Sequence, residues 1–252
     1  LSDVDSNNLT GATVTISGNF QSGGEDVLAF TAASGSGITG SFNNSTGVLT
    51  LSGTTTKALY EQTLESVTYQ NTSDDPSTSA RTITWQVNDG SSTNNLSSAV
   101  TSTVSVAAVN DVPTIANLGS NSFTFTEGAA ATLIDQSSNA ALADVDSSNF
   151  NGGNLTVTIA SGEDANEDVL SLSTSGTVAL ASTNANANVS VGGTVVGTLG
   201  NAISAGNDLV VNLNSAATAA NVQTLVQAIT YQNTDTDNPT AGTRTVRATI
   251  ND

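Results

Sequence analysis

The chain has 252 residues, of which 22 are acidic and only four are Lys or Arg, so its formal net charge is −18. This charge argues against binding to nucleic acids, whose phosphates need Lys and Arg, and it disfavours anionic membrane surfaces. Cys, His and Met are absent, which excludes disulfides, thiolate or imidazole metal ligands and serine–histidine catalysis. The strong ligands that remain are oxygens, and these suit hard cations such as Ca²⁺.

Alternating segments predict strands in the first half of the chain. They are rich in Val, Ile, Thr and aromatic residues and are separated by clusters of Gly, Asn, Ser and Asp, which is typical of an antiparallel β-sandwich. The predicted strands are 12–17, 27–31, 47–51, 66–70, 81–88 and 99–109. Residues 57–65 break the alternation, and we expect a helical turn there. Strand aromatics such as Tyr69 and Trp85 are expected to be core residues.

A short connector, Asn110-Asp111-Val112-Pro113, follows the last of these segments. Pro113 fixes its own φ and biases Val112 toward an extended conformation, so the connector should be stiff. We therefore expect one domain over residues 1–111 and a second domain over residues 112–252.

The second half of the chain repeats the pattern of the first. Its predicted strands are 122–126, 155–160, 169–173, 209–213, 228–232 and 244–250, and apolar residues at helical spacing predict a short helix within 216–227. Motifs return in the same order: Asp3-Val4-Asp5 as Asp144-Val145-Asp146, Glu25-Asp26 as Glu167-Asp168, Tyr69-Gln70-Asn71 as Tyr231-Gln232-Asn233, and Asn88-Asp89 as Asn251-Asp252. Self-similarity over a domain length indicates two tandem all-β modules, the second longer by about twenty residues.

The two copies differ at their ends. The first copy has no counterpart of residues 114–141, and the second has no counterpart of residues 99–109. We therefore expect the first module to lack its N-terminal strand and the second to lack its C-terminal strand, and we expect the chain to be a fragment of a longer protein.

Acidic residues can be assigned to one end of each sandwich because neighbouring strands run antiparallel. Alternation places Asp144 and Asp146 on the same side, and the chain direction places them near the connector. Packed carboxylates repel by several kcal/mol at low dielectric, and a bound dication removes that cost. Acidic turns are also common structural motifs, but here the pairs repeat in step with the module. We expect a Ca²⁺ site formed by Asp74, Asp75, Asn110, Asp111, Asp144 and Asp146, with Glu25 and Asp26 from the same end.

Several motifs together carry a resemblance to a known family. They are Gly24-Glu25-Asp26-Val27-Leu28, Val67-Thr68-Tyr69-Gln70-Asn71-Thr72, Val87-Asn88-Asp89-Gly90 and Val109-Asn110-Asp111-Val112-Pro113, and each copy also contains an Asp-Val-Asp-Ser motif. With them the chain resembles the cadherin-like repeats of large, type I-secreted, RTX-associated bacterial surface adhesins, over both copies almost end to end. The resemblance implies immunoglobulin- or cadherin-like sandwiches that bind Ca²⁺ between repeats.

The resemblance also implies roles for individual residues. Asn110 and Asp111 match the linker of such repeats, Asp144 and Asp146 match their Asp-x-Asp motif, and Glu127 matches the Glu at the end of the first strand. Val112 departs from the pattern, because it replaces a polar linker position. Further candidate ligands at the outer ends of the pair are Asp3, Asp5, Asp89, Glu127, Glu167, Asp168, Asp235 and Asp237.

These observations favour an extracellular spacer on a bacterial cell surface, in which Ca²⁺ stiffens the joints of an adhesin or filament that serves adhesion or biofilm formation. Its partners would be neighbouring repeats, with no nucleic acid and no membrane insertion. We do not expect an enzyme, since adjacent carboxylates such as Glu25 and Asp26 point to opposite faces of a strand and cannot form a glycosidase pair. Two alternatives stay open: a carbohydrate-binding module that contacts glycans, and a filament or sheath subunit that exchanges strands.

Overall fold

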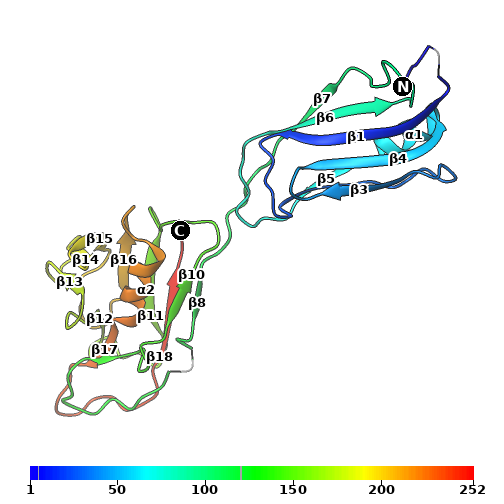
Figure 1. Ribbon diagram of the computed structural model, residues 1–252. Helices are drawn as coiled ribbons and strands as arrows, with labels where there is room; N and C mark the ends of the chain where they lie inside the picture. Colours follow the sequence, from blue (N-terminus) through cyan, green and yellow to red (C-terminus); the bar gives the residue numbers. More distant parts are fainter. Residues whose placement is uncertain (5, 120) are drawn as a thin grey trace. The chain divides into compact units, whose positions relative to one another are not determined.

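The structure is a computed structural model that describes residues 1–4, 6–119 and 121–252. The chain divides into two compact units, Leu1–Val109 and Asn110–Asp252, which we call the first and the second unit. Both units consist mainly of antiparallel sheets, with one short helix each in the described residues (Figure 1), so the expected all-β sandwich class is confirmed. Neither of these helices is long and apolar enough to span a membrane.

The first unit contains a five-stranded sheet in the order β3–β4–β1–β6–β7 and a two-stranded sheet of β2 and β5. All neighbouring strands are antiparallel. The elements are β1 (Asn8–Gly18), β2 (Asp26–Ala29), β3 (Thr39–Asn43), β4 (Val48–Thr56), α1 (Lys57–Glu65), β5 (Thr68–Asn71), β6 (Arg81–Asn88) and β7 (Val100–Val104).

The core of the first unit follows from strict alternation along β1. Ala12, Val14 and Ile16 are buried, and the residues between them are partly exposed. Helix α1 contributes Tyr60, which is fully buried and donates its hydroxyl hydrogen to the carbonyl oxygen of Gly53 at 2.7 Å. Burying such a side chain contributes about 1.5–3 kcal/mol, so a short helix is held by packing and not by its own propensity.

The second unit contains a six-stranded sheet in the order β13–β14–β15–β16–β11–β18, a three-stranded sheet in the order β12–β17–β9, and a pair formed by β8 and β10. Its elements are β8 (Thr114–Ala116), β9 (Thr132–Leu133), β10 (Ala141–Ala143), β11 (Asn154–Ser161), β12 (Asp168–Leu172), β13 (Val178–Leu180), β14 (Asn188–Val191), β15 (Thr194–Leu199), β16 (Leu209–Leu213), α2 (Ala219–Gln227), β17 (Ile229–Asn233) and β18 (Thr245–Ile250).

The extra length of the second unit lies between β12 and β15. The first unit has two strands, β3 and β4, between β2 and its helix, whereas the second has four, β13 to β16, between β12 and its helix. The added hairpin of β13 and β14 extends the large sheet beyond β15. Sequence periodicity alone did not identify either of these strands, because strands of three and four residues are too short for a period of two to stand out.

The sequence located most of the elements, but it did not predict β3, β8, β9, β10, β13, β14 or β15. Helix α1 and strands β6 and β16 have the predicted bounds, and α2 begins at Ala219, after the N-cap Thr218. The prediction of a strand over residues 122–126 is wrong. The side chains there alternate as expected, with Phe123 and Phe125 partly buried, but the backbone pairs with no described strand.

The aromatic residues that lie on strands differ in burial between the two units. Tyr231 is buried, with 7% of its surface exposed, whereas Tyr69 and Trp85 are only partly buried. Trp85 lies on β6 beside the edge strand β7, and its Nε1 donates to Ser102 Oγ at 2.9 Å. Trp85 packs against the core of the first unit and is partly buried, not fully buried as expected.

Candidate metal centre

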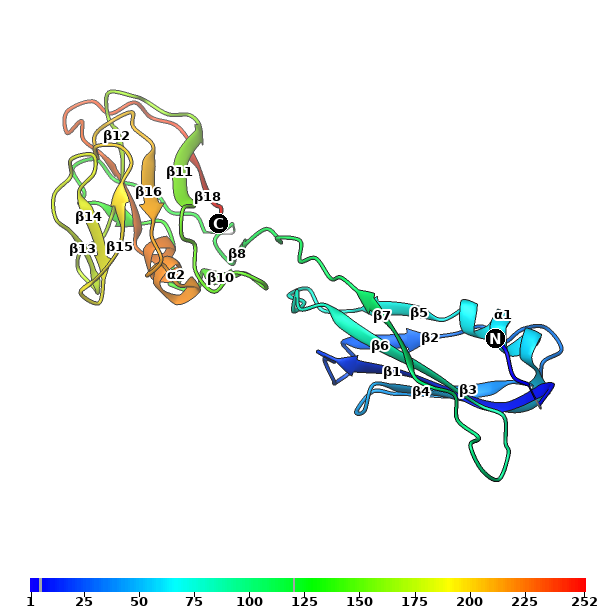
Figure 2. The same cartoon turned by 90° about the horizontal axis from the view of Figure 1, so that it is seen from above.

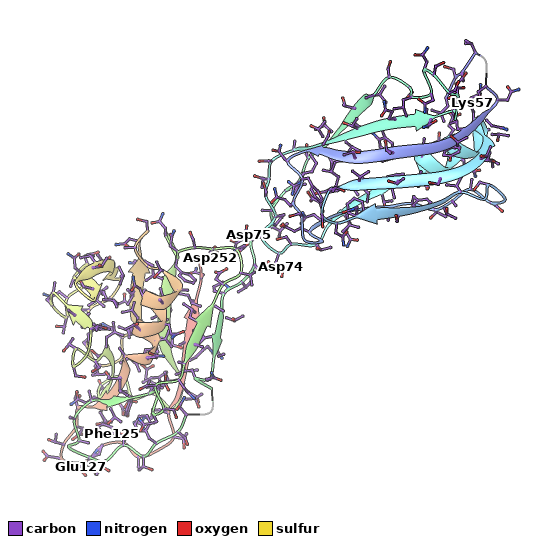
Figure 3. The ribbon with its side chains drawn as sticks, viewed as in Figure 1. Lys57, Asp74, Asp75, Phe125, Glu127 and Asp252 are labelled. Atoms are coloured by element: carbon purple, nitrogen blue, oxygen red, sulfur yellow. The ribbon has the colours of Figure 1, made fainter. Side chains whose placement is uncertain are left out.

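Three carboxylates of the second unit lie together: Asp144, Asp146 and Asp252. One oxygen of each lies within 4.8 Å of the others. Asp144 and Asp146 occupy a bend that follows β10, and Asp252 follows the end of β18. Figure 3 shows Asp252 at one end of the second unit and Glu127 at the opposite end.

Local hydrogen bonds hold the three carboxylates in place. Asp144 Oδ1 accepts from the backbone N–H groups of Asp146 at 3.3 Å and Ser147 at 3.2 Å, which makes an Asx-type turn. The hydroxyl of Ser147 donates to Asp252 Oδ2 at 2.6 Å. One turn therefore positions both members of the Asp-x-Asp motif and the carboxylate that follows β18.

The first two residues of the second unit also bind this cluster. Asn110 Nδ2 donates to Asp252 Oδ1 at 3.3 Å, and the N–H of Asp111 donates to Asp146 Oδ2 at 2.9 Å. Asn110 therefore reaches the cluster with its side chain, whereas Asp111 reaches it with its backbone N–H.

Two carboxylate oxygens of the cluster have no partner among the described residues. Asp144 Oδ2 and Asp146 Oδ1 are buried from solvent and accept no hydrogen bond. A buried acceptor without a partner costs about 1–3 kcal/mol, and more when it is charged. Repulsion between neighbouring carboxylates adds to that cost. A cation placed between the two oxygens would remove both penalties.

The pKa values follow from the same contacts. Burial raises the pKa of Asp144 above its ordinary value, and the neighbouring Asp146 and Asp252 act in the same direction. The hydrogen bond from the Ser147 hydroxyl lowers the pKa of Asp252. At neutral pH the cluster therefore concentrates negative charge on oxygen ligands of the type that Ca²⁺ prefers, since Ca²⁺ takes about 6–8 oxygens from carboxylates, amides and water.

The structure brings together four of the eight residues expected at this site, namely Asn110, Asp111, Asp144 and Asp146. Sequence reasoning missed Asp252. The available signal was the return of Asn88-Asp89 as Asn251-Asp252, which marks the end of equivalent strands. Asp74 and Asp75 lie on the exposed loop between β5 and β6 of the first unit, and their expected role as ligands at this site stays a prediction.

Asp26 was expected to be a metal ligand, but it is the acidic partner of a buried ion pair. It is fully buried and forms an ion pair with Arg81, whose Nε donates to Asp26 Oδ2 at 3.0 Å. Its Oδ1 accepts from Tyr69 at 2.5 Å and from Asn71 at 2.8 Å. Burial opposes ionisation, but the hydrogen bonds from Arg81 and Tyr69 outweigh it and lower the pKa of Asp26. Both oxygens are therefore committed to protein donors, while the neighbouring Glu25 is partly exposed.

The second unit repeats this buried network. Arg244 Nε donates to Asp168 Oδ2 at 2.9 Å, and Tyr231 donates to Asp168 Oδ1 at 2.6 Å. Burial and the hydrogen bond to Asp168 raise the pKa of Tyr231 to about 12. The repeated Glu-Asp and Tyr-Gln-Asn motifs thus form a structural ion-pair network, and Asp168 has no oxygen left for a metal.

The other candidate ligands are dispersed. Glu167 accepts from Asn233 and Thr240, and Asp235 caps a turn through the N–H groups of Asp237 and Asn238. Asp89 accepts from Ser91, and Asp3 accepts from the N–H of Ser6. Glu127 is exposed. The expected ligand Asp5 lies outside the described residues.

No family model, no curated protein and no solved structure matches the chain.

Proposed function

We propose that the chain is an extracellular spacer of a bacterial surface adhesin or filament, in which Ca²⁺ bound by the second unit stiffens the region where this unit begins. The observation that carries the proposal is the cluster of Asp144, Asp146 and Asp252, with two buried carboxylate oxygens that lack partners among the described residues. Oxygen-only ligands in an acidic chain without Cys or His suit a hard cation.

The mechanism follows from what the cluster connects. Asp146 accepts from the N–H of Asp111, and Asp252 accepts from Asn110, so a cation shared by these carboxylates would fix the entering chain against the end of β18. Pro113 limits the backbone of the next residues. Without the cation the same carboxylates repel, and the entering segment would sample more conformations.

The resemblance to cadherin-like adhesin repeats supports the same reading, because their Asp-x-Asp and Asn-Asp linker motifs correspond to residues of this cluster. The carbohydrate-binding alternative finds less support. None of the ten aromatic side chains is exposed, so an aromatic platform for sugar stacking is not formed. The strand-exchange alternative would depend on sheet edges and not on the acidic cluster.

Calorimetric titration with Ca²⁺ tests the proposal directly. We expect saturable binding to the whole chain, and weakening by about tenfold or more in Asp146→Asn, since each carboxylate contributes charge that Ca²⁺ sites need. Asp237→Asn is the matched control, because Asp237 is an exposed acidic residue outside the cluster. Equal binding by both variants would show that Ca²⁺ binds elsewhere.

Small-angle scattering with Ca²⁺ and with chelator tests the spacer mechanism. We expect a narrower distribution of interatomic distances in Ca²⁺, and we expect Asp111→Ala and Asp146→Asn to abolish that difference. Ca²⁺ binding without any change in the scattering would leave a metal site but would overturn the proposed stiffening.

A further inference from the structure

The only lysine of the chain, Lys57, binds the acidic turn of the first unit. It is the first residue of α1, and its Nζ donates to the carbonyl oxygen of Asp3 at 2.9 Å and to that of Ser6 at 2.8 Å. The same turn is closed by the N–H of Ser6, which donates to the Asp3 carboxylate at 3.0 Å. Figures 1 and 2 both show this N-terminal segment beside α1. The ammonium therefore binds the turn through two backbone oxygens.

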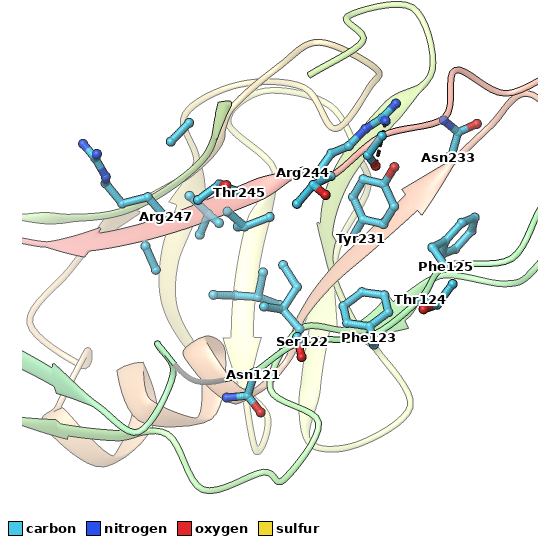
Figure 4. Close-up of a pocket in the computed structure, with 18 of the residues that line it drawn as sticks. Asn121, Ser122, Phe123, Thr124, Phe125, Tyr231, Asn233, Arg244, Thr245 and Arg247 are labelled. Carbon is cyan, nitrogen blue, oxygen red and sulfur yellow. Dashed lines mark hydrogen bonds between the residues drawn. The ribbon is translucent and has the colours of Figure 1, made fainter. Parts of the chain in front are cut away.

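The helix does not explain why a lysine stands at this position. The N-terminus of a helix carries partial positive charge, which makes a cation there unfavourable. The other basic residues have different surroundings: Arg81 and Arg244 pair with buried aspartates, and Figure 4 shows Arg247 directed away from Arg244. The contacts of Lys57 with the turn, and not its place in the helix, therefore account for the lysine.

The second unit has an alanine at the corresponding position. Both helices follow a threonine N-cap, Thr56 before α1 and Thr218 before α2, so Ala219 corresponds to Lys57. Each unit also has the Asp-Val-Asp-Ser motif, and in each the first Asp of the motif accepts from the N–H of its Ser. The two units thus combine the same turn with a different side chain at the start of the helix.

Helix α2 runs alongside β10 toward the acidic turn. Gln227 Nε2 donates to the carbonyl oxygen of Ala140 at 2.8 Å, and the N–H of Leu142 donates to Gln223 Oε1 at 3.1 Å. Four residues of a helix span about 6 Å and two residues of a strand span about 6.6 Å, so the two advance together. The next step along both elements brings Ala219 to the turn that follows β10, as Lys57 lies at the turn of the first unit.

An alanine leaves oxygens of this turn without a donor. The carbonyl oxygens of Asp144 and Ser147, which correspond to those that Lys57 binds, accept no hydrogen bond from the described residues. Asp144 Oδ2 is buried and lacks a partner among them as well. Ca²⁺ takes both backbone carbonyl and carboxylate oxygens. Ala219 is partly exposed, so a longer side chain at this position would have room to reach the turn.

We propose that the first residue of the helix determines whether the acidic turn beside it binds Ca²⁺: the Lys57 ammonium takes the place of the ion in the first unit, and Ala219 leaves that place open in the second. Asp3, Lys57 and Asp89 line one cavity of about 120 Å³, so the ammonium shares a small space with the acidic residues of this end. A fixed positive charge repels a divalent ion that approaches the same oxygens. The inference rests on the proposed Ca²⁺ site of the second unit and adds the residue that selects for the ion.

Exchanging the two residues tests the inference by calorimetric titration of the whole chain with Ca²⁺. Ala219→Lys should weaken binding by about tenfold or more, because it brings a positive charge to the turn. Ala219→Gln is the matched control, since glutamine is long but uncharged, and it should bind as the unchanged chain does. Lys57→Gln should add a Ca²⁺ site in the first unit, whereas Lys57→Arg, which keeps the charge, should not. Circular dichroism checks that each variant is folded.

Equal Ca²⁺ binding by Ala219→Lys and Ala219→Gln would overturn the inference. If Asp146→Asn still weakened binding in the same titration, the proposed function would stand without it. Lys57→Gln lies in the other unit, so it tests the inference even if Ala219→Lys does not fold, and a folded Lys57→Gln without an added Ca²⁺ site would also overturn it. No Ca²⁺ binding by the unchanged chain would overturn the inference and the proposed function together.

Discussion

The two units contain the same acidic turn, but only the first unit places a lysine beside it. In the first unit, Asp3 accepts from the N–H of Ser6, and Lys57 Nζ donates to the carbonyl oxygens of both residues, at 2.9 Å and 2.8 Å. In the second unit, Asp144 accepts from the N–H of Ser147 in the same way. The residue at the position of Lys57, the first of the helix, is Ala219.

The interiors of the two units, by contrast, each contain a buried aspartate that is paired with an arginine. Asp26 with Arg81 and Asp168 with Arg244 form the same buried ion pair, each completed by a Tyr hydroxyl. In both copies the buried aspartate has an arginine partner, whereas the acidic turn near the end of the module has a lysine beside it in the first copy only. The only tryptophan, Trp85, belongs to the first unit, so its fluorescence can separate the two units in one experiment.

The largest expected effect comes from breaking one ion pair at a time. Arg81→Ala should lower the free energy of unfolding of the first unit by about 3–5 kcal/mol, because it leaves Asp26 charged and buried. Arg244→Ala should act similarly on the second unit. Urea denaturation followed by Trp85 fluorescence should detect the first variant only, while circular dichroism should detect both. Arg247→Ala, at an exposed position, is the control. A shift of the Trp85 transition by Arg244→Ala would show that the units do not unfold independently.

Acid should destabilise both units together. The folded-state pKa values of Asp26 and Asp168 lie below the ordinary value near 3.8. A lowered pKa means that the stability these groups contribute is fully present above the unfolded-state pKa and is lost as the pH falls through the folded-state value. Thermal melting from pH 7 to pH 2 should therefore show little loss from these groups until about pH 4 and a steep loss below it. A steep loss between pH 7 and pH 5 would point to other groups.

Calcium should stabilise the second unit more than the first. At about 100 times its dissociation constant, Ca²⁺ should stabilise the second unit by about 2.7 kcal/mol, because it binds only the folded cluster. The first unit should change less, since Lys57 already supplies positive charge there. Urea denaturation with Ca²⁺ or chelator should shift the circular dichroism transition but not the Trp85 transition. An equal shift of both transitions would contradict the expected difference between the unit that contains Lys57 and the unit that contains Ala219.

Lys57→Ala should give a smaller effect that is confined to the first unit. The substitution removes two charge-assisted hydrogen bonds to backbone carbonyls, and partial exposure reduces their worth, so we expect a loss of about 1–2 kcal/mol. The Trp85 transition in urea should report it. Added Ca²⁺ should restore part of the lost stability if a bound ion can replace the lysine ammonium beside the turn. An unchanged transition would mean that Lys57 is a surface group without a structural role.

The smallest effect should come from the helix caps. Thr218 caps α2 by accepting from the N–H of Asn221 at 3.4 Å, whereas Thr56 makes no side-chain cap bond to α1. Thr218→Ala should therefore cost about 0.5–1 kcal/mol in the second unit, and Thr56→Ala should stay within about 0.5 kcal/mol in the first. Paired thermal melts measure both. A larger effect for Thr56→Ala would contradict the assignment of the caps.

Local patterns in the sequence determined the elements whose signals are short-range. Period-two alternation predicts strands such as β6 and β16, and broken alternation predicts α1, because buried faces follow directly from backbone geometry. The repeated motifs also predicted that Asp144 and Asp146 lie with Asn110 and Asp111, since antiparallel strand order fixes which end of a sandwich each loop occupies. These inferences need only the chain direction and the spacing of side chains.

Tertiary structure decided the long-range partners. Asp26 and Asp144 belong to similar acidic motifs, but one meets Arg81 across the core and the other meets Asp252 after β18. Residues 122–126 alternate like a strand, yet alternation does not supply a neighbour to bond with. Spacing along a chain specifies which way a side chain points, whereas the partner of a carboxylate or of a strand edge depends on which distant segment the packing of the core brings beside it.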